Sequence, residues 1–326
     1  MKIVVTGGAG FIGANLCRAL VKRGVESIVV IDDLSTGSEH NVNDLPVHLQ
    51  AGSVLDAELL RACLAGAHSV VHLAARPSVP LSLNDPAATN TVNSTGTLRV
   101  LEAARRESTH VVIASSSAVY GANPELPLRE EMTPMPLSPY AASKLAAESY
   151  AAAYAHSFEL PTLVFRFFNV FGPLQPPGHA YAAAIPAFLS AALTGRPLAV
   201  HGDGGQTRDF IYVGSVAHAL AEAAVKQLAH ARPINLGCGT RTSLSEVIRV
   251  IGQIVEGPVE VRKMIERPGD IRDSQADVSR LHDLLPSLRL EDIRVGLRKT
   301  IQWMKETNSE PAIPAAADQQ YATTRY

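Results

Sequence analysis

Short apolar runs alternate with longer amphipathic stretches through the first half of the chain. The runs are rich in β-branched residues and do not alternate with polar residues, which is typical of strands buried on both faces of a parallel sheet. They predict strands at 2–6, 27–31, 47–51, 69–75, 110–116 and 162–169, with helices at 11–24, 56–65, 88–107 and 141–157. This repeated order predicts an α/β fold with a doubly wound, Rossmann-type parallel sheet.

The pattern changes after residue 170, where a loop rich in proline and glycine begins. The following segments predict a helix near 182–194, short pieces in "LAVHGDG" and "RDFIYV", a strand at 233–237 that returns to the main sheet, a helix at 243–256, a strand near 258–263 and a last helix near 291–306. We therefore predict a main domain of residues 1–170 plus about 212–237, and a smaller C-terminal lobe of 171–211 plus 238–306. Residues 307–326 lack a periodic apolar face and are expected to form a disordered tail.

The composition gives no indication of binding to nucleic acid, a membrane or a metal ion. The chain has 326 residues, of which 46% are apolar and 18% charged, so a large core can form. A net charge of −2 gives no basic surplus for nucleic acid or an anionic membrane, and no apolar run reaches the ~18 residues that span a bilayer. Cys17, Cys63 and Cys238 lie too far apart in sequence for a metal motif, so we expect no metal site and a reducing, cytoplasmic location.

The stretch "TGGAGFIG" follows the first predicted strand and opens the first helix. Gly7, Gly10 and Gly13 allow a tight turn and a close approach of phosphate to the backbone at a helix N-terminus. Asp32 ends the second strand, where a carboxylate can accept hydrogen bonds from ribose hydroxyls and repel a 2′-phosphate. The alternative is a plain strand–helix turn with a solvated aspartate. The combination predicts NAD rather than NADP as the cofactor.

Tyr140 and Lys144, in "YAASK", lie one helical turn apart on one face. A phenol with a pKa of about 10 is a poor base at neutral pH, but a nearby ammonium group and the positive nicotinamide favour the phenolate. Such a tyrosine can take a proton from a hydroxyl while the carbon gives hydride to NAD. We place Ser116 against the substrate oxygen beside Tyr140, with Ser115 and Ser117 as rivals for that position.

Several stretches together resemble one family: "TGGAGFIG", "HLAA", "SSSAVYG", "PYAASK", "RFFNVFGP", "GDGGQTRDFIYV" and "RPGDIRDSQAD". From residue 1 to about 305 the chain resembles the extended short-chain dehydrogenase/reductase family, and more closely its UDP-sugar 4-epimerases, which act on UDP-glucose or UDP-N-acetylglucosamine. The resemblance implies that the main domain binds NAD and that the C-terminal lobe binds the nucleotide sugar. We also expect a homodimer joined through the helices near 88–107 and 141–157, which carry apolar residues on more than one face.

The resemblance also implies which residues contact each ligand. Contacts to NAD are expected from Gly7, Gly10, Phe11, Ile12, Gly13, Asp32, Asp33, Ser53, Val54, Leu73, Ala74, Ala75, Ser115, Tyr140, Lys144 and Phe167. Contacts to the UDP-sugar are expected from Arg76, Ser78, Ser116, Ser117, Asn169, Ala183, Arg208, Arg267, Asp270 and Ser274. Arg208 and Arg267 would neutralise the diphosphate through charge-assisted hydrogen bonds. Asn169 is expected near the diphosphate, Asp270 near the nucleotide ribose and Ala183 near the uracil.

Ser117 and Ala118 indicate which of the family's reactions the chain can catalyse. The family's 4,6-dehydratases carry Asp-Glu at these two positions, and its UDP-glucuronate decarboxylases usually carry glutamate at the second. Removal of water needs an acid for the leaving hydroxyl and a base for the C5 proton, and serine and alanine supply neither. We therefore predict 4-epimerisation through a transient 4-keto sugar. The alternatives are a 4-keto reductase or dehydratase on the same scaffold, and a non-catalytic NAD-sensing protein, which would typically lack the Tyr140–Lys144 pair.

The identity of the sugar depends on two further positions. Ser274 aligns with a position near C2 of the sugar, where members restricted to plain hexoses often carry tyrosine, so an N-acetyl group is expected to fit. Arg76 stands where the family often has a small or aliphatic residue. It is either a surface residue or a contact for an extra anionic or acyl group, which makes UDP-glucuronate the alternative substrate. Ser53 stands where an aspartate commonly contacts adenine, so that hydrogen bond is expected to be weaker.

Overall fold

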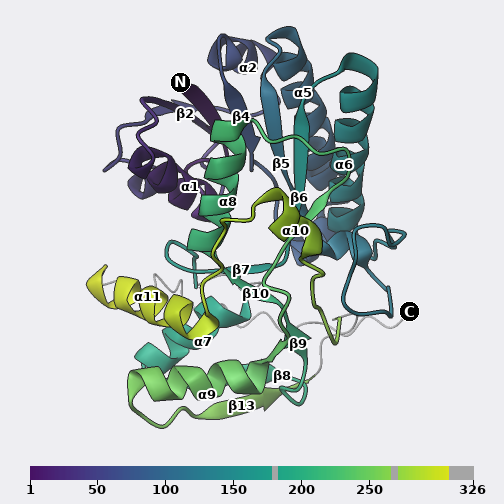
Figure 1. The fold of residues 1–326 in the computed structure, drawn as a ribbon. Helices are drawn as coiled ribbons and strands as arrows, with labels where there is room; N and C mark the ends of the chain where they lie inside the picture. The colour runs from purple at the N-terminus through teal and green to yellow at the C-terminus, as the bar shows by residue number, and fades with distance from the viewer. Residues whose placement is uncertain (178–182, 266–270, 308–326) are drawn as a thin grey trace.

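The computed structural model describes residues 1–177, 183–265 and 271–307, and its central feature is a seven-stranded sheet (Figure 1). The strands, in spatial order, are β3 (His48–Ala51), β2 (Ser27–Asp32), β1 (Lys2–Thr6), β4 (Ser69–His72), β5 (His110–Ser116), β6 (Thr162–Phe167) and β11 (Ile234–Leu236). Every neighbouring pair is parallel. The predicted doubly wound sheet is therefore confirmed, and its strand order reverses between β1 and β4, the usual place for a ligand in this fold.

Helices cover both faces of the sheet (Figure 1). One face carries α1 (Phe11–Lys22), α8 (Val213–Lys226) and α10 (Ser279–Leu284), and the other carries α2 (Ala57–Leu64), α5 (Gly96–Arg106) and α6 (Pro139–Phe158). Successive residues of a strand point to opposite faces. Ile3 and Val5 accordingly enter the apolar cluster under α1 and α8, while Val4 enters the cluster under α2 and α5. Burial on both faces explains why these strands are apolar at every position.

The sequence pattern missed some helices. Helix α8 was not predicted because its alanine-rich sequence is buried on most sides, so it lacks the polar stripe that reveals an amphipathic helix. The short helix α3 (Val79–Asn84) and the six-residue α10 were also missed. The predicted helix at 88–107 corresponds to three successive pieces, which are α4 (Pro86–Asn90), a π-helical turn at Thr91–Thr95, and α5. Shorter helical turns lie at Glu39–Asn41 and Ser117–Tyr120.

The predicted strand at 162–169 divides at Phe168. The amide of Phe168 donates to the carbonyl of Leu236, and the chain then leaves the main sheet. It continues as β7 (Asn169–Phe171), which pairs in parallel with β10 (Phe210–Tyr212) in a separate two-stranded sheet. The predicted strand at 69–75 likewise ends early, at His72. Both strands stop at the same edge of the sheet, where their carboxyl ends meet the smaller elements.

Several elements after residue 171 gather beyond that edge, in the lower part of Figure 1. They are α7 (Ala184–Leu193), β8 (Leu198–His201), β9 (Thr207–Arg208), β12 (Thr242–Ser243), α9 (Leu244–Val255), β13 (Val261–Met264) and α11 (Ile293–Glu306). Phe188, Val200, Val247 and Leu297 belong to an apolar cluster that these elements share. The division of the chain at residues 170, 212 and 237 stays a prediction, and most of the predicted tail, 308–326, lies outside the described residues.

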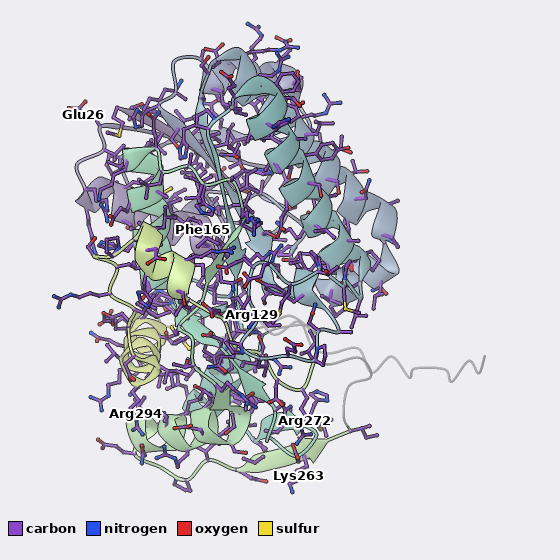
Figure 2. All side chains as sticks on the ribbon, turned by 45° about the vertical axis from the view of Figure 1, so that its right-hand side comes forward. Glu26, Arg129, Phe165, Lys263, Arg272 and Arg294 are labelled. Atoms are coloured by element: carbon purple, nitrogen blue, oxygen red, sulfur yellow. The ribbon has the colours of Figure 1, made fainter. Side chains whose placement is uncertain are left out.

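Side chains show the same arrangement in Figure 2. Phe165 of β6 is fully buried inside the main sheet region, whereas Lys263, Arg272 and Arg294 lie at the margin of the smaller part (Figure 2). Arg129 lies between the two regions, on the loop that precedes α6. In the described residues, no helix combines the length and the apolar character that crossing a bilayer requires.

Gly121 offers a test of how tightly that loop is packed. Its φ is +53°, and a Cβ atom there would lie 1.6 Å from the carbonyl oxygen of Met135. Gly24 also has a positive φ, +75°, but a Cβ atom would meet nothing within 4 Å. We expect Gly24→Ala to lower the free energy of unfolding by about 1 kcal/mol through backbone strain alone. Gly121→Ala should lower the free energy of unfolding by about 1–3 kcal/mol more than Gly24→Ala, because the loop backbone must move to admit the methyl group.

Urea unfolding of the two variants beside the wild type measures this difference. Equal losses at the two positions would show that the loop between residues 121 and 138 yields easily to an added methyl group.

Candidate active site

The carboxyl ends of the parallel strands bring the predicted site residues to one edge of the sheet. Gly7 follows β1, Ala74 follows β4, and Ser116 and Phe167 end β5 and β6. The smaller sheet of β7 and β10 and the helices beyond it face this edge (Figure 1). Residues from distant parts of the sequence therefore surround one place, as expected for a fold that binds ligands at the ends of its strands.

The glycine turn after β1 has no room for side chains. Gly7 has a φ of +69°, and a Cβ atom on it would lie 2.7 Å from the amide nitrogen of Ala74. A Cβ atom on Gly13 would lie 2.2 Å from the carbonyl oxygen of Gly7, so the first turn of α1 packs directly on the strand–helix turn. Gly10 occupies the N-cap position of α1, and no side chain of the described residues accepts a hydrogen bond from the first amides of the helix. The uncapped N-terminus of this twelve-residue helix fits the pyrophosphate of a dinucleotide.

Asp32 lies beside this turn. Its carboxylate accepts hydrogen bonds from the amides of Ala9 and Leu34, each at 2.9 Å. Burial raises the pKa of this carboxyl group, and the same two amides act against that rise. A Cβ atom on Gly37 would come within 3.1 Å of the carboxylate, so this neighbour also has to be glycine-sized. The geometry holds an acceptor at the end of β2, where the ribose of a dinucleotide is expected.

The remaining predicted NAD contacts follow the same edge of the sheet. Leu73 and Ala74 continue β4 through amide hydrogen bonds to the backbone carbonyl and the hydroxyl of Thr6. The others lie at the start of α1 (Phe11, Ile12), after β2 (Asp33), after β3 (Ser53, Val54), after β4 (Ala75) and at the end of β6 (Phe167). The Ser53 hydroxyl accepts a hydrogen bond from the amide of Leu55, 3.2 Å away.

Tyr140, Lys144 and Ser116 come together between β5 and α6. The hydroxyl of Ser138 accepts a hydrogen bond from the amide of Ala141 and thereby caps α6, which places Tyr140 in the first turn. Lys144 donates from Nζ to the carbonyl oxygen of Ala114 on β5, at 2.9 Å. A hydrogen bond between the Tyr140 and Ser116 side chains acts on the tyrosine. The structure thus places the predicted base, its lysine and the predicted serine in one group.

Burial shifts the pKa of both members of the pair. Burial raises the pKa of Tyr140 even though the hydrogen bond with Ser116 acts to lower it. Burial also lowers the pKa of Lys144, to about 8, against the opposing effect of Glu148. Desolvation disfavours the charged form of both groups, and the effect of Lys144 and the nicotinamide on the Tyr140 pKa stays a prediction.

The three consecutive serines have different partners. Ser115 is buried and donates its hydroxyl to Glu148 of α6, at 2.5 Å. Ser116 is half-buried, and its hydroxyl also accepts a hydrogen bond from the amide of Ala118. Ser117 begins the following helical turn. Both serines meet α6, but the Ser115 hydroxyl is occupied by Glu148 while Ser116 contacts Tyr140, so the contacts favour Ser116 for the position beside the substrate oxygen.

Arg76 lies just beyond β4 with a fixed backbone. Its amide donates to Oδ1 of Asn93 at 2.7 Å, and the Asn93 side chain donates back to its carbonyl at 3.3 Å. The guanidinium group lies 4.0 Å from the carboxylate of Asp85 and is about one-third exposed. Ser78 caps α3 by accepting a hydrogen bond from the amide of Leu81. The predicted contacts Arg76 and Ser78 therefore belong to one ordered connection between β4 and α3.

Three more predicted substrate contacts meet around β9 and β10. The amide of Asn169 donates to Asp209, and the amide of Ser274 donates to the carbonyl of Thr207. The guanidinium group of Arg208 donates hydrogen bonds to the carbonyl oxygens of Thr207 and Arg272. Ala183 is exposed at the start of α7. The predicted contacts Arg267 and Asp270, like the start of "YAAAIP", lie outside the described residues.

Asp209 is a residue of this site that the sequence pattern did not predict. It is fully buried, and its carboxylate accepts hydrogen bonds from the amides of Cys238, Gly239 and Ala276 at 2.8–3.0 Å. Burial raises its pKa, and these amides oppose the rise. Asp209 joins the strand that carries Arg208 to the segment that follows Ser274. An acidic residue inside the apolar stretch "DFIYV" was the signal that could have identified it.

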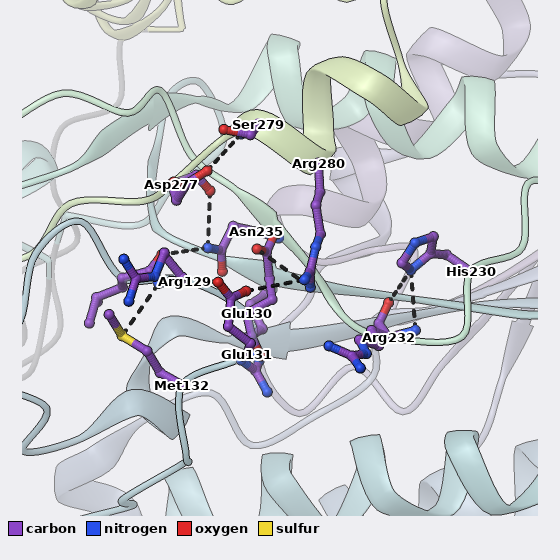
Figure 3. A network of polar contacts seen from close by, with 12 residues as sticks. Arg129, Glu130, Glu131, Met132, His230, Arg232, Asn235, Asp277, Ser279 and Arg280 are labelled. Carbon is purple, nitrogen blue, oxygen red and sulfur yellow. Dashed lines mark hydrogen bonds and ion pairs between the residues drawn. The ribbon is translucent and has the colours of Figure 1, made fainter.

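Asn235 of β11 is a second residue that was not predicted, and it forms the centre of a buried network (Figure 3). Its side chain accepts a hydrogen bond from the hydroxyl of Tyr120 at 2.6 Å and donates to the carbonyls of Leu128 and Asp277. The backbone amide of Asn235 donates to the carboxylate of Glu130, which lies 3.8 Å from the guanidinium group of Arg280. Figure 3 shows Asn235 between Glu130 and Asp277. The loop between Ser116 and Tyr140 is thus tied to the sheet and to the segment after Ser274.

This combination defines a class of protein. A glycine turn that fits a pyrophosphate, an acceptor at the end of β2 and a Ser–Tyr–Lys group at the carboxyl edge of a Rossmann sheet are the parts of a dinucleotide-dependent enzyme. The model of the NAD dependent epimerase/dehydratase family matches residues 3–237. The chain belongs to this family, and its cofactor is NAD.

Curated and solved relatives agree over nearly the whole chain. A UDP-glucose 4-epimerase of Mycolicibacterium smegmatis is 36% identical over 315 residues, which cover 94% of this chain and 99% of that protein. The structure of a UDP-N-acetylglucosamine 4-epimerase from Methanobrevibacter ruminantium, in complex with UDP-N-acetylmuramic acid, is similar with a TM-score of 0.89 and 36% identity, covering 94% and 98% of the two chains. The structure of a Thermus thermophilus UDP-glucose 4-epimerase complexed with NAD is similar with a TM-score of 0.85 and 35% identity. The match covers 94% of this chain and 99% of that chain.

Enzymes with other activities share the scaffold. A UDP-N-acetyl-alpha-D-glucosaminuronate decarboxylase of Bacillus cytotoxicus is 32% identical over 335 residues, covering 95% of this chain and 99% of that protein. Overall similarity therefore defines the family, and the choice of reaction has to be argued from the residues of the site.

The position of Asp32 leads to a prediction about cofactor choice. Asp32→Asn keeps the shape and removes the charge that would accept the ribose hydroxyls. Hydrogen bonds to a charged group contribute about 1.5–3 kcal/mol, so NAD affinity should fall by about 10- to 100-fold. NADP binding should change little or improve, because its 2′-phosphate is no longer repelled.

Calorimetric titration of cofactor-free protein with NAD and NADP measures both affinities. Asp44→Asn is the control, since Asp44 is an exposed partner of Arg18 on the surface. Unchanged discrimination between NAD and NADP in the Asp32 variant would remove Asp32 from cofactor recognition.

Proposed function

We propose that this protein is an NAD-dependent 4-epimerase of UDP-hexoses. The observation that carries the proposal is the chemistry beside Ser116 and Tyr140: the next residues, Ser117 and Ala118, offer no acid or base. Glu148, which accepts from Ser115, is paired with Arg166, and the carboxylate of Glu130 accepts a hydrogen bond from the backbone amide of Asn235. The site is therefore equipped for oxidation and reduction at one carbon, and the 4-epimerases among its relatives support this choice.

The chain's own residues supply proton transfer and orientation. Bound NAD supplies the acceptor for the C4 hydride and later its donor. Tyr140 takes the proton of the C4 hydroxyl and returns it at the end of the cycle, while Ser116 shares the hydrogen bond to the same oxygen. Lys144, anchored on Ala114, adds positive charge beside this group. Desolvation raises the pKa of Tyr140. Formation of the phenolate therefore requires the positive charges of both Lys144 and the nicotinamide of bound NAD.

Inversion at C4 requires the keto sugar to present both faces in turn. A diphosphate held by Arg208, and by Arg267 as proposed from the sequence, would stay fixed while the sugar rotates. Arg208 lies on β9 beside Ser274, whose amide is bound to Thr207. In this proposal Ser274 borders the sugar near C2, and its small side chain leaves room for an N-acetyl group in both orientations. UDP-N-acetylglucosamine and UDP-N-acetylgalactosamine are then substrates along with UDP-glucose and UDP-galactose.

UDP-glucuronate is the second candidate substrate, and Arg76 is the observation that favours it. The backbone of Arg76 is fixed by Asn93 directly after β4, and its guanidinium is in loose contact with Asp85 at 4.0 Å. A cation held there beside the substrate edge could exchange Asp85 for a carboxylate on the sugar. Such an exchange would turn Arg76 into the determinant for an acidic hexose.

We propose further that the enzyme is a cytoplasmic homodimer joined through α5 and α6. Tyr150 and Phe158 expose 39% and 49% of their surfaces on α6, and the Phe158 ring contacts Arg105 of α5. Burial of such side chains against a second copy would remove apolar surface from water. The free thiols of Cys17, Cys63 and Cys238 agree with a reducing compartment.

Replacement of Tyr140 tests the mechanism. Tyr140→Phe should lower turnover at least about 100-fold while the protein keeps its NAD, because the ring still packs but has no proton to exchange. Tyr150→Phe, on the exposed side of the same helix, is the matched control and should behave like the wild type. The assay incubates the purified enzyme with each UDP-sugar, without added reductant, and resolves the C4 epimers and any NADH.

Three outcomes contradict the proposal. Near-normal turnover by Tyr140→Phe would exclude this base. Steady NADH production would indicate a dehydrogenase, and a product lighter by one water would indicate a dehydratase.

Ser274→Tyr tests the choice of sugar. The added ring should fill the space for the N-acetyl group and lower kcat/KM for the N-acetyl pair by about 10- to 200-fold relative to UDP-glucose. Ser274→Ala is the control, since it opens the space and should preserve both activities. If Arg76→Leu instead abolishes a wild-type preference for UDP-glucuronate, the N-acetyl proposal is wrong and the acidic hexose is the substrate.

A further inference from the structure

A buried ion pair lies directly behind the proposed catalytic group. Glu148 of α6 and Arg166 of β6 are joined by two hydrogen bonds, of 2.7 and 3.0 Å, and their side chains are only 5% and 4% exposed. Ser115 of β5 adds a third contact by donating its hydroxyl to the same carboxylate. Ser115 and Arg166 are neighbours in the register of β5 and β6. One carboxylate therefore links α6 to the ends of two adjacent strands.

We propose that Glu148 is a positioning residue for the reaction, which fixes α6 against β5 and β6 and provides the negative charge that keeps Lys144 protonated. Its effect on turnover rests on the proposed function, whereas its effect on Lys144 does not.

The geometry supports attachment at three successive points. Along one side of α6, Tyr140, Lys144 and Glu148 are spaced by one helical turn each. They contact Ser116, the carbonyl of Ala114 and the hydroxyl of Ser115, which are consecutive residues of β5. Removal of the Glu148 contact leaves Tyr140 and Lys144 as the two remaining members of this row that hold α6 to the end of β5. A small rotation of α6 would then separate Tyr140 from Ser116.

The electrostatic part follows from the groups that face Lys144. His72 of β4 faces it, but burial and the lysine itself lower the pKa of His72 to about 3, so this imidazole is neutral. Strand β5 presents the neutral carbonyl of Ala114. On α6 itself the neighbours are the Tyr140 phenol and Glu148. Among these, Glu148 is the group that raises the pKa of Lys144 against the burial that lowers it to about 8.

A buried ion pair can also be purely structural, since removal of one partner leaves an uncompensated buried charge and destabilises the fold. The two roles are separable because Arg166→Gln and Glu148→Gln both break the pair, but only Glu148→Gln removes the negative charge near Lys144. Arg166→Gln is therefore the matched control for the loss of stability.

The first measurement is an NMR titration of the NAD-loaded enzyme labelled with ¹³C in the lysine side chains, with Lys144→Arg used to assign the resonance. Glu148→Gln should lower the titration midpoint of Lys144 by about one pH unit, a tenfold change in proton affinity. Arg166→Gln should move the midpoint by less than about a third of that amount. Equal shifts in both variants, or no shift in Glu148→Gln, would overturn the electrostatic role.

The second measurement is kcat and KM for the UDP-sugar as a function of pH. Loss of the Lys144 proton at lower pH should move the alkaline limb of kcat downward in Glu148→Gln, with little change in KM, and leave the limb in place in Arg166→Gln. Glu148→Asp keeps the charge but shortens the contact, so its titration should match the wild type while kcat falls about tenfold or more. Wild-type kcat in Glu148→Asp would overturn the positioning role.

If Glu148→Gln fails to fold, Glu148→Asp still tests the positioning role through kcat. If the Lys144 titration behaves as stated but no UDP-sugar is epimerised by the wild type, the proposed function is wrong and the role of Glu148 toward Lys144 stands.

Discussion

Parallel strand pairing is the constraint on which the site depends. Because β1, β2, β4, β5 and β6 all run in one direction, their carboxyl ends lie at one edge, and the residues that follow them meet there. Such a sheet has to be buried on both faces, and the two apolar clusters under α1 and α8 and under α2, α5 and α6 provide that burial. The glycine turn, Asp32 and Ser116 are thus held by the core of the protein and not by loops.

The residues behind the site are as organised as those within it. Asn235 ties the loop before Tyr140 to β11 and to the segment after Ser274, while Asp209 ties that segment to the strand of Arg208. Glu148 and Arg166 complete the support from the side of α6. Buried polar groups of this kind are costly unless every partner is present, so they specify one arrangement of the surrounding chain. The proposed base, the proposed serine and the proposed anchor of the diphosphate are therefore parts of one connected structure.

The choice among reactions depends on what this scaffold lacks at two positions. The family holds epimerases, and its relatives include a decarboxylase, on the same fold. In the proposed mechanism, Tyr140, Lys144 and Ser116 serve oxidation and reduction at one carbon. Ser117 and Ala118 add no acid or base, so the oxidised sugar has no group to help it lose water. In the proposed reaction it is reduced again after it has turned over.

The features that could be predicted from the amino-acid order alone are local ones. Apolar runs of strand length, the glycine spacing, the aspartate at the end of β2 and the tyrosine and lysine one helical turn apart all depend on residues close together in the chain. They correctly predicted the sheet and the cofactor, and they are the basis for the proposed catalytic pair. Helix α8 was not predicted, because a helix buried on most sides has no polar stripe to mark its period.

Features that depend on distant partners were fixed only by the folded chain. Ser116 is distinguished from Ser115 only by the partners that the fold supplies: Ser116 contacts Tyr140, whereas Ser115 donates to Glu148, 33 residues further along the chain. Asn235 meets Glu130 across 105 residues, and Asp209 meets Ala276 across 67. No local pattern encodes these pairs, because a buried polar residue is selected by the donors and acceptors that the fold brings to it.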